Sequence, residues 1–273
     1  MDKLVLDRVS CHVTAKCNLK CKKCSAYIPE LYMLHTPLPD YTLDQMKNSF
    51  RIYFEIVSHV RMISLSGGEP FMFDELDKLV EFILNYDDRF DKLEIFTNGT
   101  IPVPERLLSI CRANRKTCFL VDHYGPAVSK RIDTIEASLK DAGITYQIRK
   151  YFGADAHMGG WHDYGISGKK ASEDVAKFRF EKCYAGKNGN MLCTIFGTNI
   201  FLCPMSEVGR RIGSIPLNDT IHMDLCDDST SSEEKQIKLL AMNNIVVNPA
   251  CAYCNGIGVY ENEPRYMPGV QLQ

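Results

Sequence analysis

The chain has 273 residues, of which 45% are hydrophobic and 24% charged, and its formal net charge is −2. This length suits one large α/β domain with a smaller appendage, and the small net charge excludes a broad electrostatic surface for nucleic acid or anionic lipid. No apolar run approaches the roughly 20 residues that span a bilayer, and the N-terminus lacks a signal-peptide core. We therefore expect a cytoplasmic protein that binds neither nucleic acid nor membrane.

Strands and helices are expected to alternate through the first 151 residues. Apolar runs predict strands at 4–14, 61–66, 92–97, 117–122 and 145–151. Helical spacing of apolar residues predicts helices at 43–59, 74–86, 104–113 and 129–142, the first opened by a capping box at Thr42 and Gln45 and the second capped by Asp74. Residues 25–41 contain Pro29, Pro37 and Pro39, which predicts an irregular loop. The alternation predicts an α/β fold, a partial (β/α) TIM-type barrel with its site at the C-terminal ends of the strands.

The alternation stops after residue 152. We expect four parts: a barrel core at 1–152, a connecting loop or lid at 153–182, a small C-terminal auxiliary-cluster module at 183–260 and a tail at 261–273. Within the module, Ser231 and Glu234 form a capping box for a helix near 232–243.

Twelve cysteines are unusual in a chain of this kind, because disulfides are rare in the cytosol. Clustered cysteines at metal-ligand spacing are the better account, and so many thiols are expected in an anaerobe or a protected cytosol. Cys11, Cys111, Cys118 and Cys226 have no such spacing and are expected to be core or surface residues.

Cys17, Cys21 and Cys24 lie in one loop directly after the first predicted strand. Three thiolates on a short loop can hold three corners of a cubane 4Fe–4S cluster, which leaves the fourth iron free to bind a substrate or cofactor. A structural zinc site normally takes four ligands in pairs, so zinc is the weaker alternative.

This loop resembles the CxxxCxΦC signature of the radical SAM superfamily. In that family the 4Fe–4S cluster binds the amino and carboxylate groups of S-adenosylmethionine (SAM), and reductive cleavage gives a 5′-deoxyadenosyl radical. The resemblance implies an external reductant such as flavodoxin or ferredoxin. Lys23 stands where the family usually has an aromatic residue.

Two further stretches carry the resemblance, which covers about residues 5–152. Gly67, Gly68, Glu69 and Pro70 follow the second predicted strand as the family's GGEP motif, which contacts the methionine amino group. Thr97 and Asn98, followed by Gly99, resemble the TNG element that ends the third strand. The resemblance implies that both stretches bind SAM. The alternative is that they are ordinary turns.

A second set of cysteines lies in the last third of the chain. The Cys251–Cys254 CxxC pair alone would suit zinc or a redox pair. Together with Cys183 and Cys203 it resembles the twitch module, a shortened SPASM module that binds one auxiliary 4Fe–4S cluster through four cysteines. Cys193 is the alternative to Cys183 as first ligand.

Several side chains are candidates for contact with the substrate. Asp122 and His123 follow the fourth predicted strand and suit acid–base or hydroxyl contacts, while Arg149 on the fifth suits a substrate anion. Cys193, if it is not a ligand, could donate a hydrogen atom, and Trp161 suits a sugar-like ligand. Each candidate also has a structural alternative. These are a loop cluster for Asp122 and His123, an ion pair for Arg149, a buried thiol for Cys193 and a packed loop for Trp161.

The size and layout resemble small twitch enzymes that act on aminocyclitols and sugars. This implies hydrogen abstraction from a C–H bond of a small, sugar-like molecule, giving oxidation or epimerisation. One alternative is a peptide maturase or peptide epimerase, for which any leader peptide would need a separate partner because only ten residues precede Cys11. The other is a non-catalytic, cysteine-rich metal-binding or redox protein, which predicts zinc and no affinity for SAM.

Overall fold

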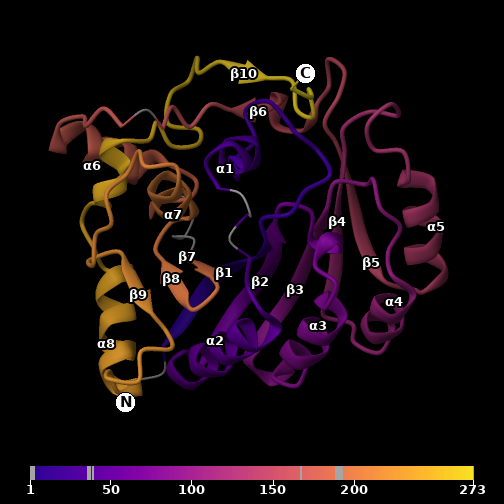
Figure 1. The fold of residues 1–273 in the computed structure, drawn as a ribbon, viewed down its shortest axis with the longest axis horizontal. Helices are drawn as coiled ribbons and strands as arrows, with labels where there is room; N and C mark the ends of the chain where they lie inside the picture. Colours follow the sequence, from indigo (N-terminus) through magenta and orange to yellow (C-terminus); the bar gives the residue numbers. More distant parts are fainter. Residues whose placement is uncertain (1–3, 36–37, 39, 167, 188–192, 273) are drawn as a thin grey trace.

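A parallel sheet forms the centre of the computed structural model, which describes residues 4–35, 38, 40–166, 168–187 and 193–272. Each neighbouring pair among its first five strands is parallel. These strands are β1 (Val5–Thr14), β2 (His59–Gly67), β3 (Phe90–Thr97), β4 (Thr117–His123) and β5 (Thr145–Lys150). The intervening helices are α2 (Leu43–Ile56), α3 (Leu76–Leu84), α4 (Glu105–Arg112) and α5 (Ile132–Asp141). Figure 1 shows these helices along one side of the sheet, and the expected α/β alternation is confirmed.

The first residues of the helices show which local sequence signals predicted a helix start correctly. The Thr42–Gln45 capping box is present at the start of α2, where it satisfies two backbone donors. Asp74 was the wrong cap for α3, which begins after Glu75 without a side-chain cap. A 3₁₀ turn at Pro70–Met72 comes first. α5 begins later than expected because Ser129 bonds to the Asn98 carbonyl and to the Tyr124 N–H instead.

The two faces of the sheet differ in polarity. Side chains of one face, such as Val9 and Cys11 on β1, join the main apolar core with α2. Side chains of the other face, such as Ser10 and His12, line a cavity. This alternation follows from the two-residue period of a strand and leaves a polar interior on the side away from the helices.

The sheet continues into the C-terminal region. β7 (Cys193–Phe196) pairs in parallel with β1, and β8 (Asn199–Phe201) and β9 (His222–Asp224) follow antiparallel. The order β5-β4-β3-β2-β1-β7-β8-β9 is open, so the barrel is partial. The remaining helices are α6 (Glu173–Lys182), α7 (Pro204–Arg211) and α8 (Ser232–Asn243), and α8 has its expected capping box. The module thus shares one sheet with the core, and its status as a separate domain stays a prediction.

Two loop expectations were wrong. Residues 25–41 contain a helix, α1 (Ile28–Leu34), because Pro29 occupies its first turn, where proline is tolerated; Pro37 and Pro39 lie outside the described residues. The end of the chain is not a free tail. β10 (Arg265–Tyr266) pairs with β6 (Trp161–His162), and the backbone of 270–272 bonds to the cysteine loop at Lys20 and Lys22. Figure 1 shows this segment crossing above α1.

No helix among the residues described is long and apolar enough to cross a membrane.

Candidate active site

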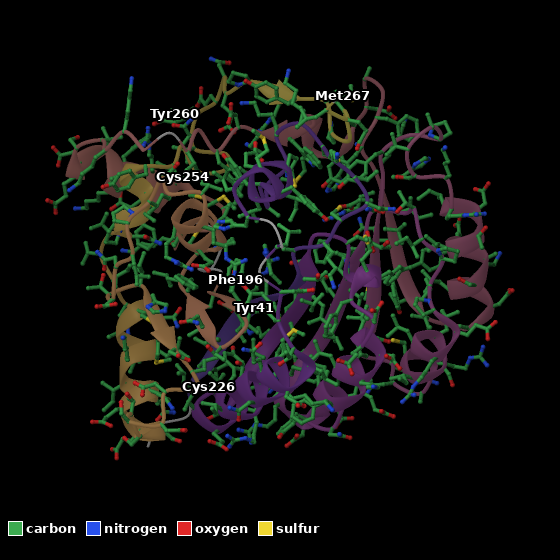
Figure 2. All side chains as sticks on the ribbon, in the orientation of Figure 1. Tyr41, Phe196, Cys226, Cys254, Tyr260 and Met267 are labelled. Atoms are coloured by element: carbon green, nitrogen blue, oxygen red, sulfur yellow. The ribbon has the colours of Figure 1, made fainter. Side chains whose placement is uncertain are left out.

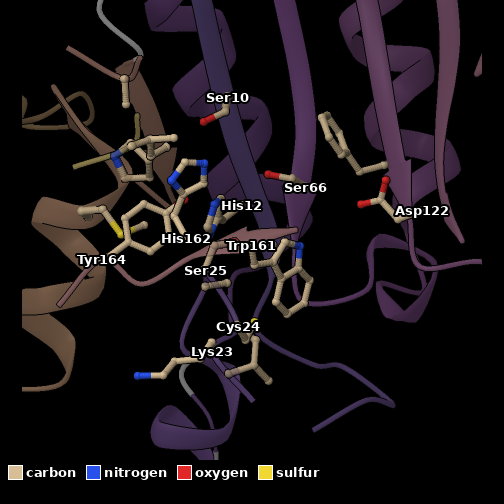
Figure 3. A pocket seen from close by; sticks show the side chains of 18 of the residues that line it. Ser10, His12, Lys23, Cys24, Ser25, Ser66, Asp122, Trp161, His162 and Tyr164 are labelled. Atoms are coloured by element: carbon tan, nitrogen blue, oxygen red, sulfur yellow. The ribbon is translucent and has the colours of Figure 1, made fainter. Parts of the chain in front are cut away.

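One cavity of about 410 Å³ collects most of the expected site. It lies at the C-terminal ends of the parallel strands, with polar strand residues on one side and the β6 region facing them, as Figure 3 shows for Ser10, Ser66, Asp122 and Trp161. Its lining includes all seven cysteines expected to be cluster ligands: Cys17, Cys21, Cys24, Cys183, Cys203, Cys251 and Cys254. It also includes Gly67, Gly68, Glu69, Pro70, Thr97 and Asn98, expected to bind the cofactor.

The cysteine loop is held by contacts from distant segments. Gln271 Nε2 donates to Cys21 Sγ at 3.2 Å, and its Oε1 accepts from the Lys20 N–H at 2.7 Å. Asn98 Nδ2 donates to Cys17 Sγ at 3.9 Å. Lys23 adopts a left-handed backbone with φ of 61°. Its ammonium pairs with Asp163 at 2.5 Å, so the residue at the family's aromatic position ties the loop to the β6 region.

Gly67 and Gly68 bring the end of β2 against the chain that leads into the cysteine loop. The Gly68 N–H donates to the Thr14 carbonyl and the Glu69 N–H to the Lys16 carbonyl, each at 2.8 Å. A Cβ on either glycine would collide with one of these carbonyl oxygens, and Gly67 also has φ of +133°. Only glycine permits this approach.

Glu69 is fully buried and aims its carboxylate at backbone donors. It accepts from the Asn98 N–H at 2.7 Å and from the Phe71 N–H at 3.2 Å. Burial raises the pKa of Glu69 to about 7, although these donors favour the ionised form. A buried carboxylate of this kind is a ready partner for a ligand ammonium group.

Four cysteines from three segments face the other side of the cavity. Cys183 ends α6, Cys203 precedes α7, and Cys251 and Cys254 lie in or just after a 3₁₀ turn at Pro249–Ala252. Figure 2 places Cys254 near α6 and α7, at the opposite end of the module from Cys226. Backbone N–H groups of Ala185 and Ile257 donate to Cys183 Sγ, and that of Gly256 to Cys254 Sγ.

Cys193 does not line the cavity, so its expected role as a catalytic residue or a cluster ligand was wrong. It is 1% exposed in β7 and belongs to the apolar core, where burial raises the pKa of its thiol to about 12. Its neighbour Thr194 points to the other face of the sheet and bonds to Ser10. Because strand side chains alternate, Cys193 faces the core, whereas Cys183 lines the cavity with Cys203, Cys251 and Cys254.

Asp122 and Arg149 line the cavity as a pair. The Arg149 guanidinium contacts Asp122 Oδ1 through Nε and Nη2, each at 2.6 Å, and the Tyr124 hydroxyl donates to Asp122 Oδ2 at 3.2 Å. Burial raises the pKa of Asp122, and Arg149 opposes that rise. His123 was expected beside Asp122 in the site, but alternation turns it outward against Phe152.

Comparison with known families decides the class of the protein. Residues 11–145 match the model of the Radical SAM superfamily. These residues form a radical SAM domain, which covers just under half of the chain. An S-adenosylmethionine-dependent nucleotide dehydratase of Selenomonas ruminantium is 31% identical over 101 residues, or 37% of this chain and 33% of the relative. The match thus spans a third of that relative's length.

A solved structure, BtrN, shares the fold of this chain. BtrN in complex with AdoMet and 2-DOIA aligns with a TM-score of 0.52 at 15% identity, over 97% of this chain and 99% of BtrN. SuiB of Streptococcus suis bound to its precursor peptide SuiA covers 95% of this chain and 72% of SuiB, with a TM-score of 0.45 at 10% identity. The likeness to BtrN extends the shared fold past the radical SAM domain into the C-terminal module.

The chemistry of the two cysteine sets fits 4Fe–4S clusters, which are held by Cys thiolates. Burial raises the pKa of Cys17 to about 12 and of Cys254 to about 12. Such thiols ionise only when a cationic centre takes the place of the protons. The backbone N–H donors at Cys183 and Cys254 suit that charge.

Sequence reasoning missed the strand residues that form the cavity floor. Arg8, Ser10 and His12 on β1 and Ser64 and Ser66 on β2 all line it. Burial, helped by Arg211, lowers the pKa of His12 to about 3, so its ring is neutral. The available signal was the alternation of polar residues within an otherwise apolar strand.

Proposed function

We propose that this radical SAM protein abstracts hydrogen from a C–H bond of a carbohydrate-type substrate and oxidises it. The convergence of seven cysteines, the GGEP motif and Thr97–Asn98 on one polar-floored cavity carries the proposal. When bound, SAM and its cluster supply a primary carbon radical, and an auxiliary cluster supplies a site for the second electron.

The chain's own residues have separable tasks in this proposal. Cys17, Cys21 and Cys24 would hold the SAM-binding cluster, and Cys183, Cys203, Cys251 and Cys254 the auxiliary one. Glu69 would accept from the methionine amino group. The Asp122 carboxylate, fixed by Arg149, offers oxygen atoms to a substrate hydroxyl, and the Trp161 ring, which packs on Tyr124, offers an apolar face.

Oxidation is favoured over epimerisation by the position of the thiols. An epimerisation needs a hydrogen-atom donor on the opposite face of the carbon, and Cys193 lies in the apolar core. Every cysteine that lines the cavity, within the described part of the chain, belongs to one of the two proposed ligand sets. This supports loss of two hydrogens as the outcome.

A second candidate is dehydration of a nucleotide. It is favoured by the 31% identity to a nucleotide dehydratase over part of the radical SAM domain. The peptide maturase, the external flavodoxin or ferredoxin and the cytoplasmic location all stay predictions.

The test is an anaerobic assay with reductant, labelled SAM and candidate sugars and nucleotides in deuterium oxide. We expect 5′-deoxyadenosine and a ketone product without solvent deuterium, from protein holding about eight irons. Loss of water would favour the dehydratase, and deuterium at an inverted carbon would favour an epimerase. Zinc in place of iron, or no 5′-deoxyadenosine under any condition, would contradict the proposal.

A further inference from the structure

Arg8 lines the cavity but, unlike Arg149 and Lys23, has no hydrogen-bond or ion-pair partner in the part of the chain that the structure describes. Arg149 pairs with Asp122, and Lys23 pairs with Asp163. Arg8 Nε is buried without a hydrogen-bond partner, and no ion pair of Arg8 is found within the described residues. A buried, unpaired polar group is costly, so a ligand that pairs with it would gain from doing so.

The position of Arg8 separates it from the proposed cofactor site. It lies six residues before the C-terminal end of β1, about 20 Å at 3.3 Å per residue. The cysteine loop begins beyond that end, so Arg8 marks the far floor of the same cavity. Ser10 and Ser64 also line this floor, and they stand opposite each other in the β1–β2 register.

We propose that Arg8 anchors an anionic group of the substrate, a phosphate or a carboxylate. This rests on the proposed function in placing the substrate in this cavity. A guanidinium presents a planar fork of donors that matches both oxyanions. A neutral sugar could accept hydrogen bonds from Arg8 but would leave its charge without a counter-charge, and a cationic amino sugar would be repelled. The substrate class is therefore an acidic or phosphorylated sugar.

The test measures binding without reductant, so its result does not depend on SAM cleavage. Four probes, glucose 6-phosphate, glucuronate, glucose and glucosamine, are titrated calorimetrically into anaerobically reconstituted protein with SAM. We expect one anionic probe to bind at least about tenfold more tightly than glucose, and glucosamine to bind no better than glucose. Preference for glucose 6-phosphate would assign a phosphate, and preference for glucuronate a carboxylate.

Variants test whether Arg8 causes the preference for anionic probes. Arg8→Gln should remove the preference, while Arg8→Lys, which keeps the charge, should retain part of it. Arg61→Gln on the next strand is the matched control, since Arg61 is exposed and pairs with Asp7. Iron content of each variant checks folding, and Arg8→Lys serves if Arg8→Gln does not fold. A preference that survives Arg8→Gln, or equal or absent binding of all probes to the unmodified protein, would overturn the anchor. Failure of 5′-deoxyadenosine formation would instead overturn the proposed function.

Discussion

The two cysteine sets face one cavity but are built in opposite ways. Cys17, Cys21 and Cys24 come from one loop of eight residues after β1, whereas Cys183, Cys203, Cys251 and Cys254 come from three segments that span 72 residues. Both sets receive backbone N–H donors, that of Leu19 at Cys17 among them, and the first set also receives side-chain donors from Asn98 and Gln271. A single loop can be ordered by a few docking contacts. The dispersed set depends on the packing of the whole module.

Substitution of one cysteine in each set should separate the tasks of the two proposed clusters. The loss of activity in these variants is the largest effect that we expect. Cys24→Ala should lower 5′-deoxyadenosine formation at least about a hundredfold, or 2.7 kcal/mol, because the first cluster would be lost. Cys203→Ala should retain SAM cleavage but lose substrate oxidation. Each variant should fall from about eight irons to about four.

Cys111→Ala controls for the loss of a buried thiol, since Cys111 is 1% exposed in α4 and lies outside the cavity. Iron analysis, electron paramagnetic resonance and product assays make the measurement. If Cys203→Ala abolished SAM cleavage as fully as Cys24→Ala, the two sets would not be independent.

The docking of the first loop on β2 should be sensitive to a single methyl group. Gly68→Ala places a Cβ against the Lys16 carbonyl, so we expect a loss of about 1–3 kcal/mol in the free energy of unfolding and weaker SAM binding. Gly143→Ala is the matched control. Its φ is +66°, but no neighbour in the described ranges lies within 4 Å of an added Cβ, so only backbone strain of about 1 kcal/mol is expected. Denaturant unfolding of both variants gives the comparison, and equal losses would contradict the close approach.

SAM binding should depend on pH through Glu69. With a pKa of about 7, the carboxylate is ionised above that pH and protonated below it. Affinity for the SAM ammonium group should therefore rise up to about pH 7 and weaken by up to about tenfold per pH unit below it. Because the folded pKa is raised from its ordinary value of 4.5, Glu69 itself lowers stability increasingly between about pH 4.5 and 7.

Glu69→Gln should bind SAM weakly at every pH and lose this slope. Equilibrium binding of SAM across pH 5.5–8.5 tests both proteins. A slope that persists in Glu69→Gln would assign the titration to another group.

The sequence predicted those parts of the site that depend on local pattern. The cysteine loop and GGEP could be located because three thiols in eight residues, and a Gly-Gly turn directly after a strand, are both typical of loops that hold a cluster or a ligand. The cavity floor was indicated only by polar residues alternating along β1, and whether Arg8 points into the cavity depends on the register of β1 with its neighbours. Cys193 and His123 were wrong for the same reason, because a shift of one residue along a strand reverses the face. Gln271 lies 250 positions from Cys21, and no local pattern predicts that contact.

The smallest expected effect tests whether the side-chain donors of the first set matter electronically. Gln271 Nε2 donates to Cys21 Sγ, and a hydrogen bond to a ligand sulfur stabilises the reduced cluster. Gln271→Leu should therefore make the midpoint potential of that cluster more negative, by about 40 mV for a bond of about 1 kcal/mol in a one-electron couple. Gln236→Leu is the matched control, because Gln236 donates to the Ile56 carbonyl away from the cavity. Redox titration monitored by electron paramagnetic resonance gives both potentials. An unchanged potential in Gln271→Leu would make the contact a docking contact alone, and the two cysteine sets would then differ in assembly but not in electronic tuning.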